Sequence, residues 1–373
     1  MTVSTPGVAL DLVLADLREL IECESPSSDL QAVARSADVV ARIGASRMGA
    51  EPERIVIDGC THLVWRHGPT KVLLVGHHDT VWPLGTLARQ PFSVVDGVLR
   101  GPGCFDMSAG LVMAMHTVAA LGEAGRAGVT VLVTGDEEIG SPTSRSLIEE
   151  EARGAVAALV LEASADGGAL KTARKGTSMY EIHLTGRAAH AGLEPEKGIN
   201  AGVELAHQVL ALGALSDSEA GTTVTPTASN AGTTLNTVPA AASVSVDVRA
   251  WTVAEQERVD AAIRALTATL PGASISVRGG INRPPLEESS SRELFARASR
   301  LAEALGQPPV SATAVGGASD GNFTAGVGTP TLDGLGAVGG GAHADSEHVV
   351  VDRLVDRTIL LQALVAELLE ESA

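Results

Sequence analysis

The stretch GVTVLVTGDEEIGS, from Gly128 to Ser141, joins an apolar run to three consecutive acids. A run of β-branched residues that begins at a glycine predicts a strand buried on both faces, as in a parallel sheet. Ligands of such sheets bind beyond the carboxyl ends of the strands, which is where Asp136, Glu137 and Glu138 fall. Three adjacent carboxylates repel one another unless a cation compensates their charge. The alternative is a solvated helix start, where the helix dipole favours acids.

The residues on both sides of this stretch follow an α/β pattern. Helical periodicity covers residues 8–22, 30–48, 107–121 and 352–369, and apolar strands are predicted at 61–66, 71–76 and 155–163. Strands that alternate with helices indicate a mostly parallel sheet covered by helices.

The pattern changes in the middle of the chain. Residues 178–185 alternate, with Tyr180, Ile182 and Leu184 on one face, and SVSVDVR at 243–249 alternates in the same way. This predicts an α+β insert with an antiparallel sheet that has one packed and one solvated face. Helices are predicted beside these strands, at 200–212 and 253–270.

The composition of the 373-residue chain limits its function. The length suggests two domains, and 27 basic against 45 acidic residues disfavour nucleic-acid binding. Three cysteines give no disulfide framework and fit a cytoplasmic location. The N-terminal segment has no basic region and is read as an amphipathic helix, and no segment approaches the roughly 18 apolar residues of a membrane span. We therefore expect neither nucleic acid nor a membrane as a partner.

Histidines and acids also follow other strands and glycine turns. In KVLLVGHHDTVWP, His77 and Asp79 share a face of the extended chain. A metal-binding imidazole commonly donates its second N–H to a carboxylate, a role open to Asp79. RGPGCFDMSAG presents Asp106 before a helix, where the alternative role is an N-cap. Glu162 ends an apolar strand, and GGGAHADSEHV places His343 in a glycine loop.

Two imidazoles and three carboxylates at such positions suit two zinc ions. The five residues are His77, Asp106, Glu138, Glu162 and His343. One carboxylate can bridge metals about 3.5–4 Å apart. Glu137 then remains beside a ligand as a general base for the attacking water.

The motifs GHHDTV, GPGCFDMSAG, TGDEEIGS and GAHADSEHV occur in the order known from one enzyme family. The chain resembles the M20 family of co-catalytic zinc metallopeptidases over nearly its whole length. Within that family it is most similar to the glutamate carboxypeptidase (carboxypeptidase G2-like) branch.

The resemblance implies two Zn²⁺ ions per subunit, with Co²⁺ or Mn²⁺ as alternatives. It implies that His77, Asp106 and Glu162 bind one ion. Asp106, Glu138 and His343 would bind the other, with Asp106 as the bridge.

The resemblance also implies the roles of the neighbouring residues and the domain plan. Asp79 would orient His77, and Glu137 would be the base that later protonates the leaving amine. An inserted lid domain at 175–286, which also mediates dimerisation, would interrupt a catalytic domain made of residues 1–174 and 287–373. We therefore expect a homodimer.

The implied substrate contacts lie in this lid. GRAAHAG carries His190, which the resemblance places in the active site of the partner subunit, where it polarises the scissile carbonyl; the alternative is a turn histidine that faces solvent. Asn236 and Arg249 align with residues that bind the substrate carboxylate, and Arg283 is a second candidate. The alternative role of Arg249 is an ion pair with Asp247.

The expected function is therefore that of a dizinc hydrolase that cleaves an amide or peptide bond next to a free α-carboxylate. Its substrate would be a small peptide or an N-acyl amino acid, with release of C-terminal glutamate as one candidate reaction. The runner-up is an N-acyl-amino-acid deacylase of the acetylornithine or succinyl-diaminopimelate type. A third hypothesis is a non-catalytic binding protein on the same fold.

Overall fold

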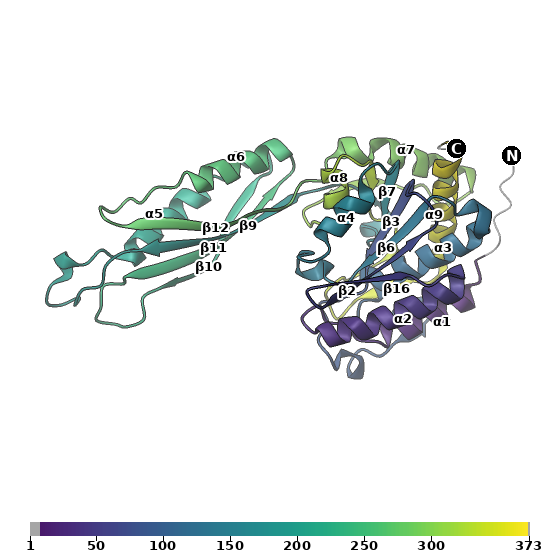
Figure 1. The fold of residues 1–373 in the computed structure, drawn as a ribbon, viewed down its shortest axis with the longest axis horizontal. Coiled ribbons are helices and arrows are strands. Elements are labelled where there is room, and N and C mark those ends of the chain that lie inside the picture. The colour runs from purple at the N-terminus through teal and green to yellow at the C-terminus, as the bar shows by residue number, and fades with distance from the viewer. Residues whose placement is uncertain (1–7, 372–373) are drawn as a thin grey trace. The chain divides into compact units, whose positions relative to one another are not determined.

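The computed structural model describes residues 8–371 and divides the chain into two units (Figure 1). The large unit contains the residues up to Ala173, Glu288–Val315 and the residues from Ser319 onward. The small unit contains Arg174–Glu287 and Gly316–Ala318.

The large unit is built on a six-stranded sheet. Its strands, in spatial order, are β1 (Glu53–Ile57), β2 (Cys60–Arg66), β6 (Val129–Thr134), β3 (Val72–His77), β7 (Ala157–Val160) and β14 (Thr331–Leu332). The last four are parallel to one another, which confirms the mostly parallel α/β fold.

The helices of the large unit cover both faces of this sheet. They are α1 (Leu10–Ile21), α2 (Leu30–Met48), α3 (Ala109–Gly125), α4 (Arg145–Ala152), α7 (Glu288–Ala304), α8 (Gly321–Gly326) and α9 (Asp352–Glu371). Shorter strands complete the unit: β4 (Ser93–Val95), β5 (Val98–Arg100), β8 (Leu170–Arg174), β13 (Ala312–Val315), β15 (Gly339–Gly340) and β16 (His348–Val350).

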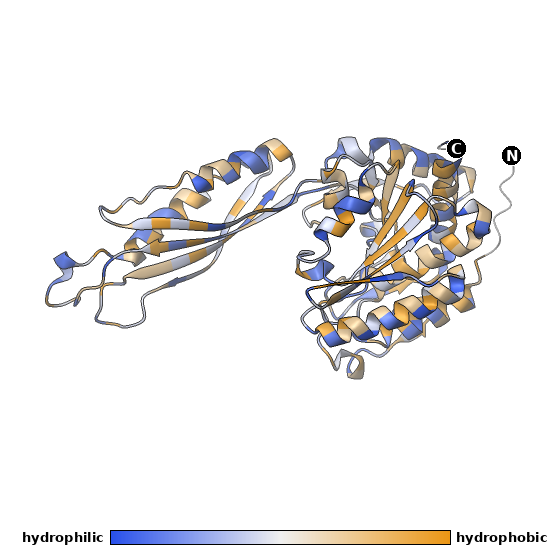
Figure 2. Ribbon diagram, viewed as in Figure 1, coloured by the Kyte–Doolittle hydropathy of each residue, from blue (hydrophilic) through white to orange (hydrophobic). Residues whose placement is uncertain are grey.

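Alternate residues of the central strand β3 enter two separate cores. Val72 and Leu74 pack in the core that includes residues of α1, α2, α3 and α9. Leu73 and Val75 pack on the opposite face with residues of α4 and with Phe323 of α8. Figure 2 shows the hydrophobic colour concentrated along the central strands of this unit. Burial on both faces explains why these strands are continuous apolar runs.

Strand β1, which forms a hairpin with the predicted strand β2, is an addition to the predicted elements. Asp58 and Gly59 form its two-residue turn with positive φ angles of 49° and 85°, which Asp-Gly adopts readily. β1 was not predicted from the sequence, because its residues are mostly exposed and show no clear alternation.

Cys104–Gly125 form one helical segment that is long and apolar enough to cross a membrane, with a mean hydropathy of 1.4. No segment of this kind was expected from the sequence. However, 78% of the tested window is buried inside the large unit. A buried core helix passes the same test, so the segment is weak support for a membrane span.

The small unit contains an antiparallel four-stranded sheet, as predicted. Its order is β10 (Thr223–Ala231), β11 (Ala241–Ala250), β9 (Gly176–Thr185) and β12 (Ser274–Arg283). The buried face of β9 carries Tyr180, Ile182 and Leu184, which pack with residues of α5 (Ala201–Gly213) and α6 (Val253–Arg264).

Helix α6 ends at Arg264, earlier than residue 270, which was the end predicted from the sequence. The carboxylate of Glu204 accepts the backbone N–H groups of Thr269 and Leu270. These two amides are therefore bound by a side chain of α5 instead of by helix carbonyls.

Candidate metal centre

Three parallel strands bring the expected metal ligands to one edge of the sheet. β3 ends at His77, β6 ends at Thr134 just before the three acids, and β7 ends two residues before Glu162. Because β6, β3 and β7 are neighbours, their carboxyl ends lie side by side. A short turn before α3 contributes Asp106, and the loop between β15 and β16 contributes His343.

Asp106 lies between the two histidines. Its Oδ1 is 3.7 Å from His77 Nε2, and its Oδ2 is 3.1 Å from His343 Nε2. Glu162 Oε1 is 3.6 Å from His77 Nε2, and Glu138 Oε2 is 3.2 Å from His343 Nε2. The five side chains thus form two groups that share Asp106. A carboxylate that bridges two cations needs this arrangement.

Two atoms of this cluster lack the hydrogen bonds that buried polar groups normally make. Among the described residues, His77 Nε2 and Glu138 Oε1 are buried and have no hydrogen-bond partner. Such atoms are rare in folded proteins unless another group satisfies them. Imidazole nitrogens and carboxylate oxygens are ligands that zinc takes, so the residues present fit a metal site.

The electrostatics of the cluster also favour cations. Burial alone would lower the pKa of His77, but the Asp106 carboxylate raises it well above the usual value. Hydrogen bonds to Asp106 and Glu138 raise the pKa of His343 to about 10. The surrounding carboxylates thus favour positive charge at both imidazoles, and any proton on a ligating ring nitrogen must leave before a metal ion binds there.

Asp79 is buried, and its carboxylate binds the loop that carries the acids. Oδ1 accepts the Glu137 N–H at 3.1 Å, Oδ2 accepts the Glu138 N–H at 3.2 Å, and Ser27 Oγ donates to Oδ2 at 2.6 Å. His77 Nδ1 is 2.9 Å from the Asp79 carbonyl oxygen but 3.4 Å from the carboxylate. The carbonyl is thus the closer partner of the imidazole.

Asp136, the first of the three acids, binds the turn that follows. Its Oδ2 accepts both the N–H and the hydroxyl of Thr143 at 2.7 Å, and the Ser144 hydroxyl donates to Oδ1. Asp136 therefore fixes the loop, whereas Glu138 faces His343.

Glu137 is buried beside the group that contains His77 and Glu162. An oxygen of its carboxylate and one potential ligand atom from each of these residues lie within 4.8 Å of one another. A carboxylate at this place can serve either as a further ligand or as a base for a bound water.

A second buried cluster also has residues of metal-binding type but is already hydrogen-bonded. One potential ligand atom from each of Cys60, His62 and Asp136 lies within 4.8 Å of the other two. His62 Nδ1 accepts the Gly135 N–H, and its Nε2 contacts Thr143 Oγ1 at 3.0 Å. Burial raises the pKa of the Cys60 thiol to about 12. Through the hydrogen bonds of His62 and Asp136, this cluster supports the acidic loop and the turn after it.

His190 and Asn236 lie in neighbouring loops of the small unit, and both are exposed. The Ala191 N–H donates to the Asn236 carbonyl at 2.9 Å. His190 Nδ1 accepts the N–H groups of Gly192 and Leu193, each at 3.2 Å. The proton of the neutral ring therefore lies on Nε2, which is a donor.

Arg249 of β11 and Arg283 of β12 lie on the two strands that flank β9. Both pair in register with Thr177 of β9. Arg249 forms a two-point ion pair with Asp247, with Nε–Oδ1 and Nη2–Oδ2 distances of 2.9 Å. The ion pair with Asp247, which is the alternative role for Arg249, is thus present in the structure. Arg283 is buried, with 7% of its surface exposed.

The two sets of expected substrate contacts lie at opposite ends of the small unit's sheet. Arg249 pairs with Thr177 at the start of β9, whereas Ala241 pairs with Thr185 at its end, before the His190 loop. The separation between positions 241 and 249 corresponds to roughly 26 Å of extended strand. One small substrate cannot contact both sets within a single chain.

A parallel α/β sheet whose strand ends gather two histidines and several acids is typical of metal-dependent hydrolases. Residues 73–367 match peptidase family M20/M25/M40, and the chain belongs to this family. The resemblance found in the sequence is thereby confirmed. Metal dependence is a property of this family, and the chain is a hydrolase of amide bonds.

Curated relatives support this assignment, and a solved structure has a similar fold. The chain is 30% identical over 372 residues to carboxypeptidase G2 of Pseudomonas sp. (strain RS-16), which covers 95% of this chain and 89% of that protein. It is 28% identical over 322 residues to succinyl-diaminopimelate desuccinylase 2 of Shewanella loihica, covering 79% and 84%. The fold is similar to that of the M20 family metallo-carboxypeptidase Sso-CP2 of Sulfolobus solfataricus, with a TM-score of 0.74, 16% identity and coverage of 95% and 99%.

Proposed function

We propose that the protein is a dizinc hydrolase that cleaves an amide or peptide bond next to a free α-carboxylate and releases an amino acid. The observation that carries this proposal is the position of Asp106, which is shared by two histidine–glutamate groups. The substrates would be small peptides or N-acyl amino acids. C-terminal glutamate is the first residue to test, because the chain is 30% identical to carboxypeptidase G2.

In this proposal the two groups of side chains hold one ion each. His77 and Glu162 would bind one Zn²⁺, His343 and Glu138 would bind the other, and Asp106 would bind both, with Co²⁺ or Mn²⁺ as alternatives. When bound, the ions would polarise the scissile carbonyl and lower the pKa of the attacking water.

The remaining steps fall to Glu137 and Asp79. Glu137 would take a proton from the attacking water and donate it to the leaving amine. Asp79 accepts the Glu137 N–H at 3.1 Å, and its carbonyl lies 2.9 Å from His77 Nδ1. One buried residue would thus orient both the base and a metal ligand.

The small unit would supply the contacts to the substrate and the dimer interface. Arg249 would bind the α-carboxylate, with Arg283 as a second contact. His190 and Asn236 would act in the active site of a partner subunit. The separation of the two sets along the sheet supports this division, because a complete site then needs two chains.

Metal removal is the first test of this function. We expect a chelator to abolish amide hydrolysis, and two equivalents of Zn²⁺ per chain to restore it. The assay would follow amino acid released from N-acyl-glutamates and glutamyl dipeptides, beside elemental analysis of the protein. An active protein that contains no metal would overturn the proposal.

Replacement of Arg249 tests the site for the carboxylate. Arg249→Ala should raise KM by about 10–100-fold and change kcat little, because the charge on the substrate is the same in the ground and transition states. Arg278→Ala is the matched control, because Arg278 is an exposed arginine of β12 in the same sheet. Equal effects of both substitutions, or a loss confined to kcat, would contradict this role.

The second candidate is an N-acyl-amino-acid deacylase. The identity of 28% to succinyl-diaminopimelate desuccinylase 2 favours it. N-acetyl and N-succinyl amino acids therefore belong in the same substrate panel, and the best kcat/KM decides between the candidates. A protein that binds metal but cleaves no member of the panel would favour a binding role.

The three free cysteines support the expected cytoplasmic location.

A further inference from the structure

Glu347 is a buried carboxylate that is surrounded by N–H donors. Only 3% of its surface is exposed. Its Oε1 accepts the backbone N–H groups of Phe105 and Asp106, each at 3.0 Å. Its Oε2 accepts the Gly103 N–H at 3.0 Å and the Trp82 indole N–H at 2.9 Å. Hydrogen bonds of this charge-assisted kind are stronger than those between neutral groups.

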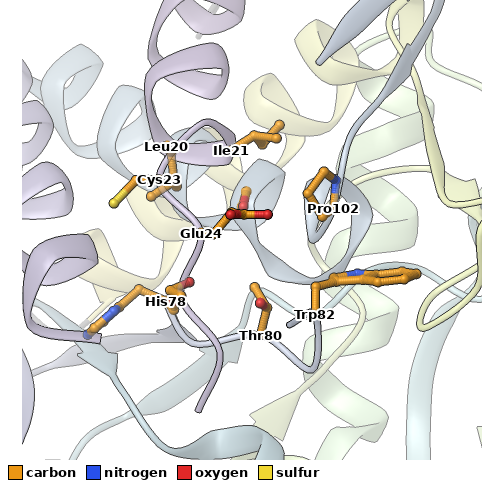
Figure 3. Close-up of a pocket in the computed structure, with 10 residues that line it drawn as sticks. Leu20, Ile21, Cys23, Glu24, His78, Thr80, Trp82 and Pro102 are labelled. Carbon is orange, nitrogen blue, oxygen red and sulfur yellow. The ribbon is translucent and has the colours of Figure 1, made fainter. Parts of the chain in front are cut away.

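These donors all belong to the surroundings of one candidate ligand. Gly103 and Phe105 precede Asp106 in the turn before α3, so the carboxylate binds the backbone that presents Asp106. Trp82 follows the His77 strand, and Figure 3 shows it beside Pro102, at a small cavity that both residues line. Glu347 is thus the acceptor to which this turn and the segment after β3 both donate.

Glu347 also belongs to the segment that carries the second histidine. It lies four residues after His343, and its N–H donates to the Ala344 carbonyl at 2.9 Å. His343 has a φ of 61°, a conformation that is uncommon for residues other than glycine and that surrounding contacts must maintain. Asp106 Oδ2 and His343 Nε2 are 3.1 Å apart. The Glu347 side chain therefore connects the segment that carries His343 to the turn that carries Asp106.

We propose that Glu347 is a positioning residue, which holds the Asp106 turn against the His343 loop and thereby sets the affinity of the metal site between them. The proposal rests on the proposed metal-dependent function and adds a determinant of its metal affinity. Glu347 is not itself a candidate metal ligand, because its two carboxylate oxygens already accept four N–H groups.

Glu347→Gln tests the proposal at nearly constant volume. The amide NH₂ would replace one acceptor oxygen and would face N–H donors, so the turn that carries Asp106 would lose its fixed position. Residues that orient metal ligands typically contribute 10–100-fold to metal affinity. We expect the metal-free variant to bind Zn²⁺ about 10–100-fold more weakly than the wild type, as measured by competition with a chromophoric chelator. We also expect an altered absorption spectrum of the Co²⁺ form.

Glu204→Gln is the matched control. Glu204 is fully buried in the small unit and accepts the backbone N–H groups of Thr269 and Leu270, as Glu347 does in the large unit. Its replacement should leave Zn²⁺ affinity and the Co²⁺ spectrum unchanged. Equal losses in both variants would mean that metal affinity reports only general stability, and the proposal would be wrong.

Trp82→Phe keeps the test decisive if Glu347→Gln does not fold. It removes one donor to Glu347 and leaves the three backbone amides in place, so we expect a smaller loss of Zn²⁺ affinity in the same direction. Wild-type affinity in whichever of the two variants folds would overturn the proposal. Because metal affinity is measured without substrate, an enzyme that binds two ions but cleaves no amide would refute the proposed function alone. A wild-type protein that binds no metal would refute both.

Discussion

Glu137→Gln should retain its metal ions and lose at least about 10²–10⁴-fold in turnover. The glutamine side chain has nearly the same volume and length as that of glutamate, but it cannot take a proton from water. The backbone contact that fixes residue 137 comes from Asp79 and does not involve the substituted group. The loop should therefore keep its conformation.

The neighbouring acid provides the matched comparison. Glu138 Oε2 is 3.2 Å from His343 Nε2, so Glu138→Gln should weaken metal binding as well as turnover. Elemental analysis and kcat, measured on both variants at saturating Zn²⁺, separate the two roles. Near-full turnover of Glu137→Gln would assign the base to another group.

A third outcome would assign Glu137 differently. Its carboxylate lies close enough to His77 and Glu162 to be a ligand of the same ion. If Glu137→Gln loses one equivalent of metal, Glu137 is a ligand and not only a base. Metal content thus has to be measured before the turnover is interpreted.

The sequence was sufficient to place the candidate ligands because parallel strands have a simple geometry. His77, the acidic loop and Glu162 each follow an apolar run, and the carboxyl ends of such strands lie at one edge of the sheet. Which acid faces which histidine did not follow from this strand pattern and was implied only by the family resemblance. That pairing depends on the paths of the loops that carry Asp106 and His343.

The support around the ligands was not predictable from sequence, because it is made by contacts between distant segments. Ser27 lies 52 residues before Asp79 and donates to its carboxylate, in a stretch with no motif. Asp79 was expected to orient His77 through its carboxylate, but its carbonyl oxygen is the closer atom. The carboxylate instead binds backbone amides of the acidic loop, which no residue pattern encodes.

His190→Ala should lower kcat by about 10²–10³-fold while metal content stays unchanged, as expected for the loss of one preorganised oxyanion donor. The neutral ring has its proton on Nε2, because Nδ1 already accepts two backbone N–H groups. His190 is exposed and lies in the loop beyond the end of β9 that is remote from Arg249. A donor at this place suits a site completed by a second chain. Retained turnover in His190→Ala would leave it as a turn histidine that faces solvent.

Subunit exchange tests whether the donor acts across a dimer. A mixture of inactive His190→Ala and inactive Glu137→Gln should regain activity, because each hybrid dimer has one site with both an intact base and an intact histidine from the partner. Random exchange of equal amounts makes half of the dimers hybrid, so about a quarter of the wild-type activity should return. Each variant incubated alone is the control, and native mass spectrometry confirms that hybrids form. If hybrids form and no activity returns, His190 acts within its own subunit or has no part in the reaction.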